Sequence, residues 1–223
     1  MTDTLPPFHN QSLLVTALTH RSALNEQSST STISNERLEF LGDAVLELAT
    51  TKFLYHNHPH EPEGVLTAYR SALVKTTTLA EVASSLGIGE KLYLSKGEEA
   101  GGGRANESLL ADTFEAIVGA LYLDQGMPIV ESFLAEHLFP KFATIKAKKL
   151  YKDPKSSLQE VVQAKGFATP VYKVIEEIGP DHEKEFTVEA IVDGEPMGRG
   201  MGKSKQLAQQ EAARVALEQY EQQ

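Results

Sequence analysis

The sequence predicts two structural parts, an all-α domain over residues 1–149 and a small α+β domain of order α-β-β-β-α over residues 153–222. Apolar residues recur at helical spacing through the first part, and no convincing strand pattern occurs before residue 150. Short segments with near-alternating Val, Ile, Tyr and Phe follow only after that point. The charged and polar stretch 146–157 contains an Asp-Pro turn signal, and it predicts a linker between the two parts.

Helices account for most of the first part. The expected helix over residues 35–57 places Leu38, Leu41, Val45 and Leu48 at helical spacing, and Asn35 is its expected N-cap. Further helices are expected over residues 66–86, 107–126 and 129–148. The Ser/Thr-rich segment 27–34 and the glycine-rich segment 97–104 are expected to be loops.

The second part changes its periodicity from helix to strand and back again. A helix is expected over residues 155–165, three strands over 171–177, 186–192 and 197–202, and a final helix over 204–220. Gly179-Pro180-Asp181-His182 and Asp193-Gly194 lie between the strands, and both are turn signals.

Composition restricts the class of protein. Hydrophobic residues make up 41% of the 223-residue chain and charged residues 23%, which is typical of a folded globular protein. The absence of cysteine excludes disulfides, thiolate metal sites and a cysteine nucleophile. No apolar run approaches the roughly 18–20 residues that a membrane span requires, and the N-terminus has no secretory pattern. We therefore expect a cytoplasmic protein without a membrane partner.

The net charge of −10 argues against the basic footprint that is common in nucleic-acid-binding proteins. Residues 151–223 alone carry a net charge of −4. Any RNA binding must therefore use a local basic patch or bound cations.

Two expected helices carry regularly spaced acids. Glu36, Glu39 and Asp43 stand at i, i+3 and i+7, and Asp112 and Glu115 repeat the i, i+3 spacing among strongly apolar neighbours. Acids embedded in such helices need a partner, because an unpaired buried charge is costly. One such partner is Mg²⁺, which prefers carboxylate oxygens and can activate water for phosphodiester hydrolysis.

An alternative needs no metal. The acids can form a solvated face or pair with Arg37, Arg70 and Arg104. On spacing alone this alternative is favoured, because acid pairs at i, i+3 are common.

A resemblance to a known family changes this balance. Residues 35–46 (NERLEFLGDAVL) look like the signature segment of the ribonuclease III family, including the spacing of its three acids. Residues 110–122 (LADTFEAIVGALY) are similar to the second acidic helix of that family. Segments 19–22, 63–64 and 69–74 also match in order, so the resemblance extends over nearly the whole chain, from about residue 13 to 217.

The resemblance implies an endoribonuclease that cuts double-stranded RNA with Mg²⁺, for which Mn²⁺ can substitute, and that leaves 5′-phosphate and 3′-hydroxyl ends. It implies Glu39, Asp112 and Glu115 as metal ligands, Glu115 and Asp43 as catalytic carboxylates, and Glu36 and Glu63 as supporting residues. It further implies a homodimer and a role in processing ribosomal RNA precursors and structured messenger RNA. His20 and Arg21 are expected to serve structure, in a capping or packing network, rather than catalysis.

The second part resembles a double-stranded RNA-binding domain. Residues 153–160 (DPKSSLQE) and 200–205 (GMGKSK) carry this likeness, together with the alanines that follow. Such domains read the shape of A-form RNA through 2′-hydroxyl and phosphate contacts. The resemblance implies RNA contacts by five residues: Gln159, Glu160, His182, Lys203 and Lys205.

Two observations temper this interpretation. Gln206 stands where a second consecutive lysine is common in the family, and acids lie near the expected minor-groove loop, so we expect weak RNA binding by the isolated domain. Taken alone, Lys203 and Lys205 would be an ordinary solvated helix start. The glycine-rich segment 198–204 also resembles a nucleotide-binding loop, but it has Met197 where that motif needs glycine.

Two other functional classes remain to be distinguished. A non-catalytic RNA-binding protein with a vestigial nuclease domain would bind duplex RNA without cutting it, although the full set of acids argues against this. An all-α metal phosphohydrolase acting on small molecules would leave residues 153–220 unexplained.

Overall fold

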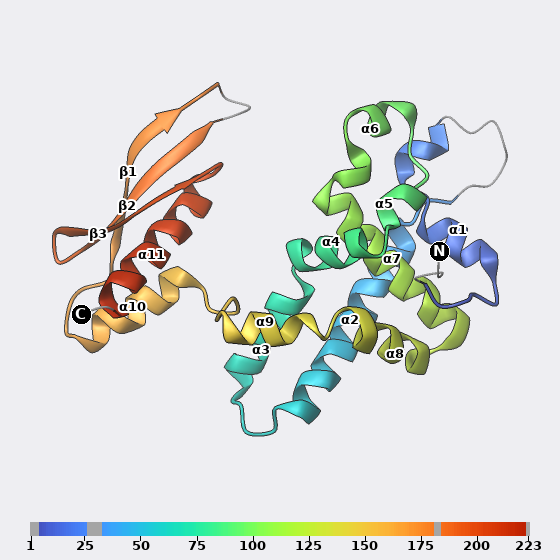
Figure 1. Ribbon diagram of the computed structural model, residues 1–223, viewed down its shortest axis with the longest axis horizontal. Helices are drawn as coiled ribbons and strands as arrows, with labels where there is room; N and C mark the ends of the chain where they lie inside the picture. Colours follow the sequence, from blue (N-terminus) through green and yellow to red (C-terminus); the bar gives the residue numbers. More distant parts are fainter. Residues whose placement is uncertain (1–4, 26–32, 181–183, 222–223) are drawn as a thin grey trace. The chain divides into compact units, whose positions relative to one another are not determined.

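The computed structural model describes residues 5–25, 33–180 and 184–221. The chain divides into two compact units, Met1–Tyr151 and Lys152–Gln223 (Figure 1). Within the described residues, no helix is long and apolar enough to cross a membrane.

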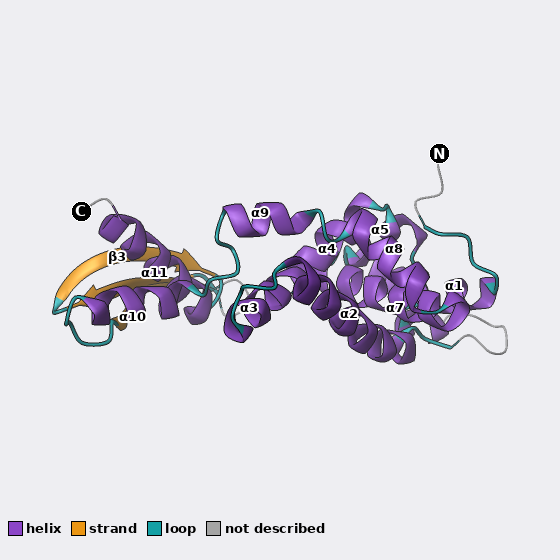
Figure 2. Cartoon of the chain, turned by 90° about the horizontal axis from the view of Figure 1, so that it is seen from below, coloured by secondary structure: helices purple, strands orange, loops and turns teal. Residues whose placement is uncertain are grey.

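The first unit consists of helices, as predicted (Figure 2). They are α1 (Gln11–Ala17), η1 (Arg21–Asn25), α2 (Glu36–Asn57), α3 (Glu63–Val74), α4 (Thr76–Ser85), α5 (Ile88–Lys91), α6 (Lys96–Ala100), η2 (Gly103–Ala105), α7 (Glu107–Gln125), α8 (Met127–His137) and α9 (Lys141–Ala147). Its only extended pairing among the described residues is an isolated bridge between Thr19 and Tyr93.

Helix α7 lies at the centre of this unit. Ten of its nineteen residues are buried, and it contacts α1, α2, α4, α5 and α8. The side chain of Asn106 begins the helix by accepting hydrogen bonds from the backbone N–H groups of Ser108 and Leu109, and Gly126 ends it at a φ of 80°. A helix buried on most of its circumference must be apolar nearly all round. The few acids on α7 are therefore exceptions that need an explanation.

The close crossing of α2 and α7 depends on two glycines. A Cβ atom on Gly42 would lie 1.8 Å from the carbonyl oxygen of Glu115, and one on Gly119 would lie 2.3 Å from the carbonyl oxygen of Leu38. Both distances are far shorter than any van der Waals contact, so only glycine allows the two backbones to approach this closely. Gly42 lies between Glu39 and Asp43 along α2, so the crossing brings the acids of the two helices together.

Three details of the first unit differ from the sequence prediction. The helix expected over residues 66–86 breaks at Lys75, which is extended at φ −67° and ψ 150°, so that its carbonyl oxygen accepts hydrogen bonds from Thr78 and Leu79 and begins α4. The helix expected over 129–148 divides into α8 and α9 near Pro140, which has no N–H to continue the first helix.

The third difference lies in the glycine-rich segment 97–104, which was expected to be a loop. It forms the end of α6 and the beginning of η2 instead. The hydroxyl of Ser95 accepts a hydrogen bond from the Glu98 N–H and caps α6, and the positive φ of Gly102 allows the turn between the two helices. Asn35 stands at the N-cap position of α2 as predicted, but its side chain makes no capping hydrogen bond.

The second unit has the predicted α-β-β-β-α order. It contains α10 (Pro154–Ala164), β1 (Val171–Ile178), β2 (Glu185–Val192), β3 (Glu195–Gly202) and α11 (Lys205–Glu221). The strands form an antiparallel sheet in the order β1-β2-β3. The buried residues Leu158 and Val162 of α10 form one core with Val188 of β2 and the alanines of α11.

A stripe of glycines on β3 lets α11 lie directly against the strand. Cβ atoms on Gly198 and Gly200 would lie 2.3 Å from the Ala212 oxygen and 2.2 Å from the Ala212 nitrogen. The α11 residues that meet this stripe are Ala208, Ala212 and Ala216, all fully buried. The segment that resembles a nucleotide-binding loop is therefore a packing surface.

We predict that Gly42→Ala destabilises the first unit by about 3 kcal/mol or more, because its new methyl group would overlap the backbone of α7. Thermal or urea denaturation of the full chain measures the change. Gly64→Ala is the matched control, since Gly64 is helical but has no atom within 4 Å of a Cβ. That substitution should be neutral or stabilising by up to about 1 kcal/mol. Equal effects of the two changes would contradict the crossing argument.

Candidate active site

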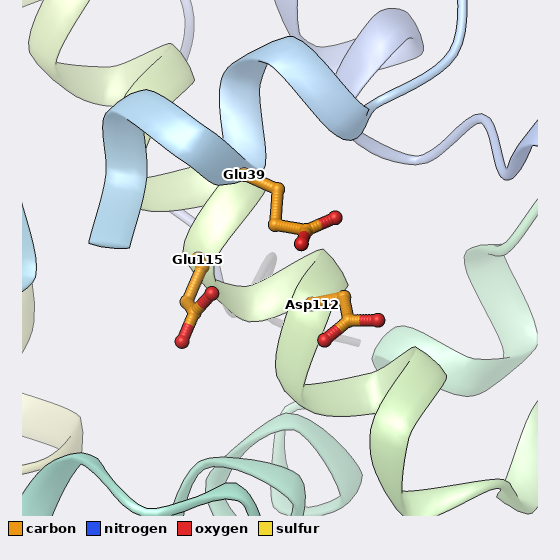
Figure 3. Close-up of side chains that lie close together, drawn as sticks. All are labelled: Glu39, Asp112 and Glu115. Carbon is orange, nitrogen blue, oxygen red and sulfur yellow. The ribbon is translucent and has the colours of Figure 1, made fainter. Parts of the chain in front are cut away.

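Three carboxylates converge where α2 and α7 cross. One oxygen atom each from Glu39, Asp112 and Glu115 lies within 4.8 Å of the other two (Figure 3). Asp112 and Glu115 stand at i and i+3 on α7, and Glu39 points toward them from α2. All three residues are half-buried. Such a set of hard oxygen atoms fits a divalent cation such as Mg²⁺.

The charge of this cluster is poorly compensated by the protein. Burial raises the pKa of Glu115 to about 8, and repulsion from Asp43, Asp112 and Glu39 adds to the rise. The pKa of Glu39 is also raised, first by burial and then by Asp112, Glu36 and Asp43. Burial raises the pKa of Asp112, and attraction to the His20 imidazole partly opposes this rise. A cation between the three carboxylates would offset both the burial of their charges and their mutual repulsion.

Two of the three arginines that could neutralise the cluster are paired elsewhere. Arg70 forms an ion pair with Glu47 at 2.9 Å. Arg104 pairs with Glu99 at 2.7 Å, and its guanidinium also donates to the carbonyl oxygens that end α5. Arg37 is exposed on the first turn of α2. Pairing with Arg70 or Arg104 therefore does not account for the cluster.

Other predicted acids lie around the cluster rather than in it. Asp43 is exposed one turn beyond Glu39, near enough to raise the pKa values of Glu39 and Glu115. Glu36 pairs with Arg21 at 3.6 Å. Glu63 begins α3, where it accepts a hydrogen bond from the Thr67 hydroxyl and lines a mostly apolar cavity of about 380 Å³.

His20 belongs to a hydrogen-bonded network. Its Nδ1 lies 2.8 Å from the Ser22 hydroxyl and 3.3 Å from the Ser22 N–H. The Ser22 hydroxyl also accepts a hydrogen bond from the Ser95 N–H, so the network joins η1 to the start of α6.

Four of the five predicted RNA-binding residues fall within the described residues, and all four lie on the surface of the second unit. Gln159 and Glu160 are exposed on α10, and Lys203 and Lys205 are exposed at the start of α11. His182 lies outside the described residues.

Two features of this surface were not foreseen from the sequence. Lys205 forms an ion pair at 2.9 Å with Glu177 near the end of β1, so its ammonium group already has a carboxylate partner. Gln206 and Gln159 line one open cavity of about 480 Å³, together with Tyr172, whose buried hydroxyl has no protein partner. Both features join elements that are distant in the sequence, so no local motif could have indicated them.

Comparison with known proteins agrees with this geometry. Residues 10–142 match the family model described as Ribonuclease-III-like, and residues 154–220 match the double-stranded RNA binding motif. The Ribonuclease 3 proteins of Geobacillus thermodenitrificans and Streptococcus thermophilus are 48% and 45% identical to this chain. These alignments cover 95% of this chain and 85% and 92% of those proteins.

The chain belongs to the ribonuclease III family.

A solved structure points the same way for the first unit. The nuclease domain of Ribonuclease III from Campylobacter jejuni is 37% identical, with a TM-score of 0.56, and the match covers 61% of this chain and 92% of that domain. A second structure of the same domain gives 38% identity and a TM-score of 0.55. As a family member the chain is an endoribonuclease with a double-stranded RNA-binding motif, which sets aside the non-catalytic and small-molecule alternatives.

The raised pKa of Glu115 predicts a pH-dependent effect on stability. The folded protein keeps the Glu115 proton up to about pH 8, whereas the unfolded chain releases it near 4.5, so metal-free stability falls as the pH rises between these values. Glu115→Gln removes this pH-dependent loss of stability, because a glutamine side chain does not ionise. We expect it to stabilise the metal-free protein by about 1–3 kcal/mol above pH 8, allowing for solvent screening, and by little below pH 4.5.

Urea denaturation of wild type and variant in EDTA, across this pH range, measures the difference. Glu107→Gln, an exposed change on the same helix, should show no such trend. A Glu115→Gln effect that is constant with pH would contradict the assignment of the pKa.

The Lys205–Glu177 pair predicts that removing an acid strengthens RNA binding. Glu177→Gln frees Lys205 for phosphate, so the affinity of the full chain for duplex RNA should rise roughly two- to fivefold. The slope of log affinity against log salt should steepen by about 1. Glu218→Gln is the matched control, because it changes the net charge equally but lies far along α11 from Lys205, where Arg214 keeps its ion pair with Glu211. Equal gains from both variants would show a general charge effect instead.

Proposed function

We propose that this chain is a Mg²⁺-dependent endoribonuclease that hydrolyses duplex RNA and leaves 5′-phosphate and 3′-hydroxyl ends. The observation that carries the proposal is the convergence of Glu39, Asp112 and Glu115 within 4.8 Å in a member of this family. In this proposal the nuclease domain occupies residues 1–149 and the RNA-binding domain residues 153–222. Its substrates include structured RNA such as ribosomal RNA precursors and messenger hairpins.

The carboxylates have distinct roles in this mechanism. Glu39, Asp112 and Glu115 would hold the cation, and Mn²⁺ would be able to replace Mg²⁺ because it accepts the same ligands. A bound divalent cation makes water a stronger nucleophile and stabilises charge on the leaving oxygen. As the water oxygen attacks phosphorus, the water loses a proton to the solvent. The bond from phosphorus to the 3′-oxygen breaks, and that oxygen takes a proton from the solvent. Asp43, exposed beside the cluster, accepts a hydrogen bond from the attacking water.

The second domain holds the duplex by its shape. Gln159 and Glu160 on α10 are placed to contact 2′-hydroxyl groups, and Lys203 and Lys205 contact phosphate at the start of α11. His182 contacts the minor groove in this proposal. The match of residues 154–220 to the RNA-binding motif and the exposure of the described members support these assignments.

A homodimer would place two such clusters on one duplex. An apolar stripe along α2 supports this part of the proposal, since Phe40, Leu48 and Tyr55 are 83%, 59% and 68% exposed. The Campylobacter jejuni nuclease domain is described as structurally flexible in a region involved in its dimer formation. Glu36 and Glu63, which lie outside the cluster, would support the site near this interface.

The decisive test is cleavage of a long perfect RNA duplex. Wild type should cut it in Mg²⁺ or Mn²⁺ and not in EDTA. Glu115→Gln should lower the rate by about a hundredfold or more while duplex binding persists. Glu107→Gln should cut like wild type. Binding without cutting under any metal condition would make the protein a duplex-RNA binder whose carboxylates are structural.

The dimer proposal predicts that Leu48→Glu separates the subunits, because two glutamates would be buried near each other across a symmetric interface. Sedimentation velocity at micromolar concentration should change from dimer to monomer. Leu123→Glu, at another exposed leucine of the same domain, should remain dimeric. A wild-type monomer would refute the proposal directly.

A further inference from the structure

An open cleft of about 640 Å³ lies beside the acidic cluster. The proposed catalytic and metal-binding roles do not involve the residues that line it. It is formed where η1, α6 and the start of α7 meet. The polar side chains that line it are His20, Arg21, Ser22, Glu98, Asn106 and Ser108.

The cleft and the acidic cluster lie along the same face of α7. Ser108, Asp112 and Glu115 stand at i, i+4 and i+7, so they share one face of the helix. One helical turn, about 6 Å of axial rise, separates the serine from the first carboxylate. His20 lines the cleft and also interacts with Asp112. A strand held with a phosphate at the carboxylates would therefore extend into this cleft.

The hydrogen-bonding capacity of the cleft favours an anionic oxygen. The Ser22 N–H donates to Nδ1 of His20, so a neutral imidazole carries its proton on Nε2 and is a donor there. The oxygen of the Asn106 side chain is used to cap α7, which leaves its NH₂ group to donate. The Arg21 side chain pairs with Glu36 at 3.6 Å but remains 72% exposed, so its guanidinium adds a cation at the rim that can also reach a phosphate.

Glu98 gives the cleft one strong acceptor among these donors. The Glu98 N–H is held by the Ser95 hydroxyl at 3.1 Å, and Gly103 packs so closely that a Cβ there would lie 2.9 Å from Cγ of Glu98. A carboxylate repels a free anion but accepts a hydrogen bond from a hydroxyl group. Donors for phosphate beside an acceptor for hydroxyl match a ribose-phosphate unit, in which the 2′-hydroxyl distinguishes RNA from DNA.

We propose that this cleft binds the ribose-phosphate unit next to the hydrolysed bond, with Arg21 and His20 on the phosphate and Glu98 on the 2′-hydroxyl. The inference rests on the proposed nuclease function and adds a way for the nuclease domain to select RNA.

A deoxynucleotide scan tests the Glu98 contact. Duplex substrates carry a single 2′-deoxynucleotide at successive positions on either side of the cut, and KM and kcat are measured for the full-length protein. In the wild type, one position should lower kcat/KM by about tenfold. Glu98→Ala should cut the all-RNA duplex about tenfold more slowly and lose sensitivity at that position only. Glu107→Ala, an exposed acid outside the cleft, should keep the wild-type pattern.

The phosphate contact has its own test, which does not depend on the folding of the Glu98 variant. Arg21→Ala should raise KM about tenfold with kcat little changed, and Arg21→Lys should recover part of the loss. A neutral methylphosphonate at the phosphate beside the cut should affect wild type more than Arg21→Ala. Lys141→Ala, which removes a cation paired with Glu81 elsewhere on this domain, should change neither value.

Failure of the nuclease function and failure of the ribose-phosphate contact give different results. A wild-type protein that cuts no duplex refutes the nuclease function itself. A wild type that cuts, with no sensitive deoxy position or with the same sensitivity in Glu98→Ala, overturns the 2′-hydroxyl contact. If the Glu98 variant melts far below wild type, an unchanged methylphosphonate effect in Arg21→Ala overturns the proposal instead.

Discussion

The contact of α2 with α7 is the constraint on which the candidate site depends. Gly42 and Gly119 let two helix backbones meet without intervening side chains, and the acids one turn away are thereby brought within 4.8 Å. Apolar burial along α7 stabilises the contact while the clustered carboxylates oppose it. The unit therefore gives up some stability so that three acids can share one place, as is common at functional sites.

The sequence was sufficient for the helical character of the first unit and for the order of elements in the second, because those periodicities are strong and local, but it did not predict the short helices α1 and α5. The acid spacing on α2 and α7 also identified which residues would share a face. It could not show that Glu36 and Glu63 lie outside the cluster, since this depends on the crossing of distant helices. The break at Lys75 and the helical turn at Ser95–Ala100 were missed, because backbone capping decides them and hydrophobic pattern does not.

In the RNA-binding domain, too, the sequence indicated local motifs but not the contacts between distant elements. Its glycines on β3 and alanines on α11 were visible as a motif, yet only the structure shows that they are two sides of one tight contact. The pairing of Lys205 with Glu177 likewise requires the sheet to bring β1 beside the start of α11. The acidic residues of this domain therefore do more than lower its net charge, because one of them pairs directly with a lysine at the start of α11.

The proton held by Glu115 has a consequence for metal uptake. A carboxylate must be ionised before it can ligate a cation, so at pH values below about 8 any ion entering the cluster releases a proton to the solvent. Metal loading and acid release are then a single equilibrium. In a weakly buffered compartment, the acidity of the surroundings would set the occupancy of the site as directly as the supply of the ion does.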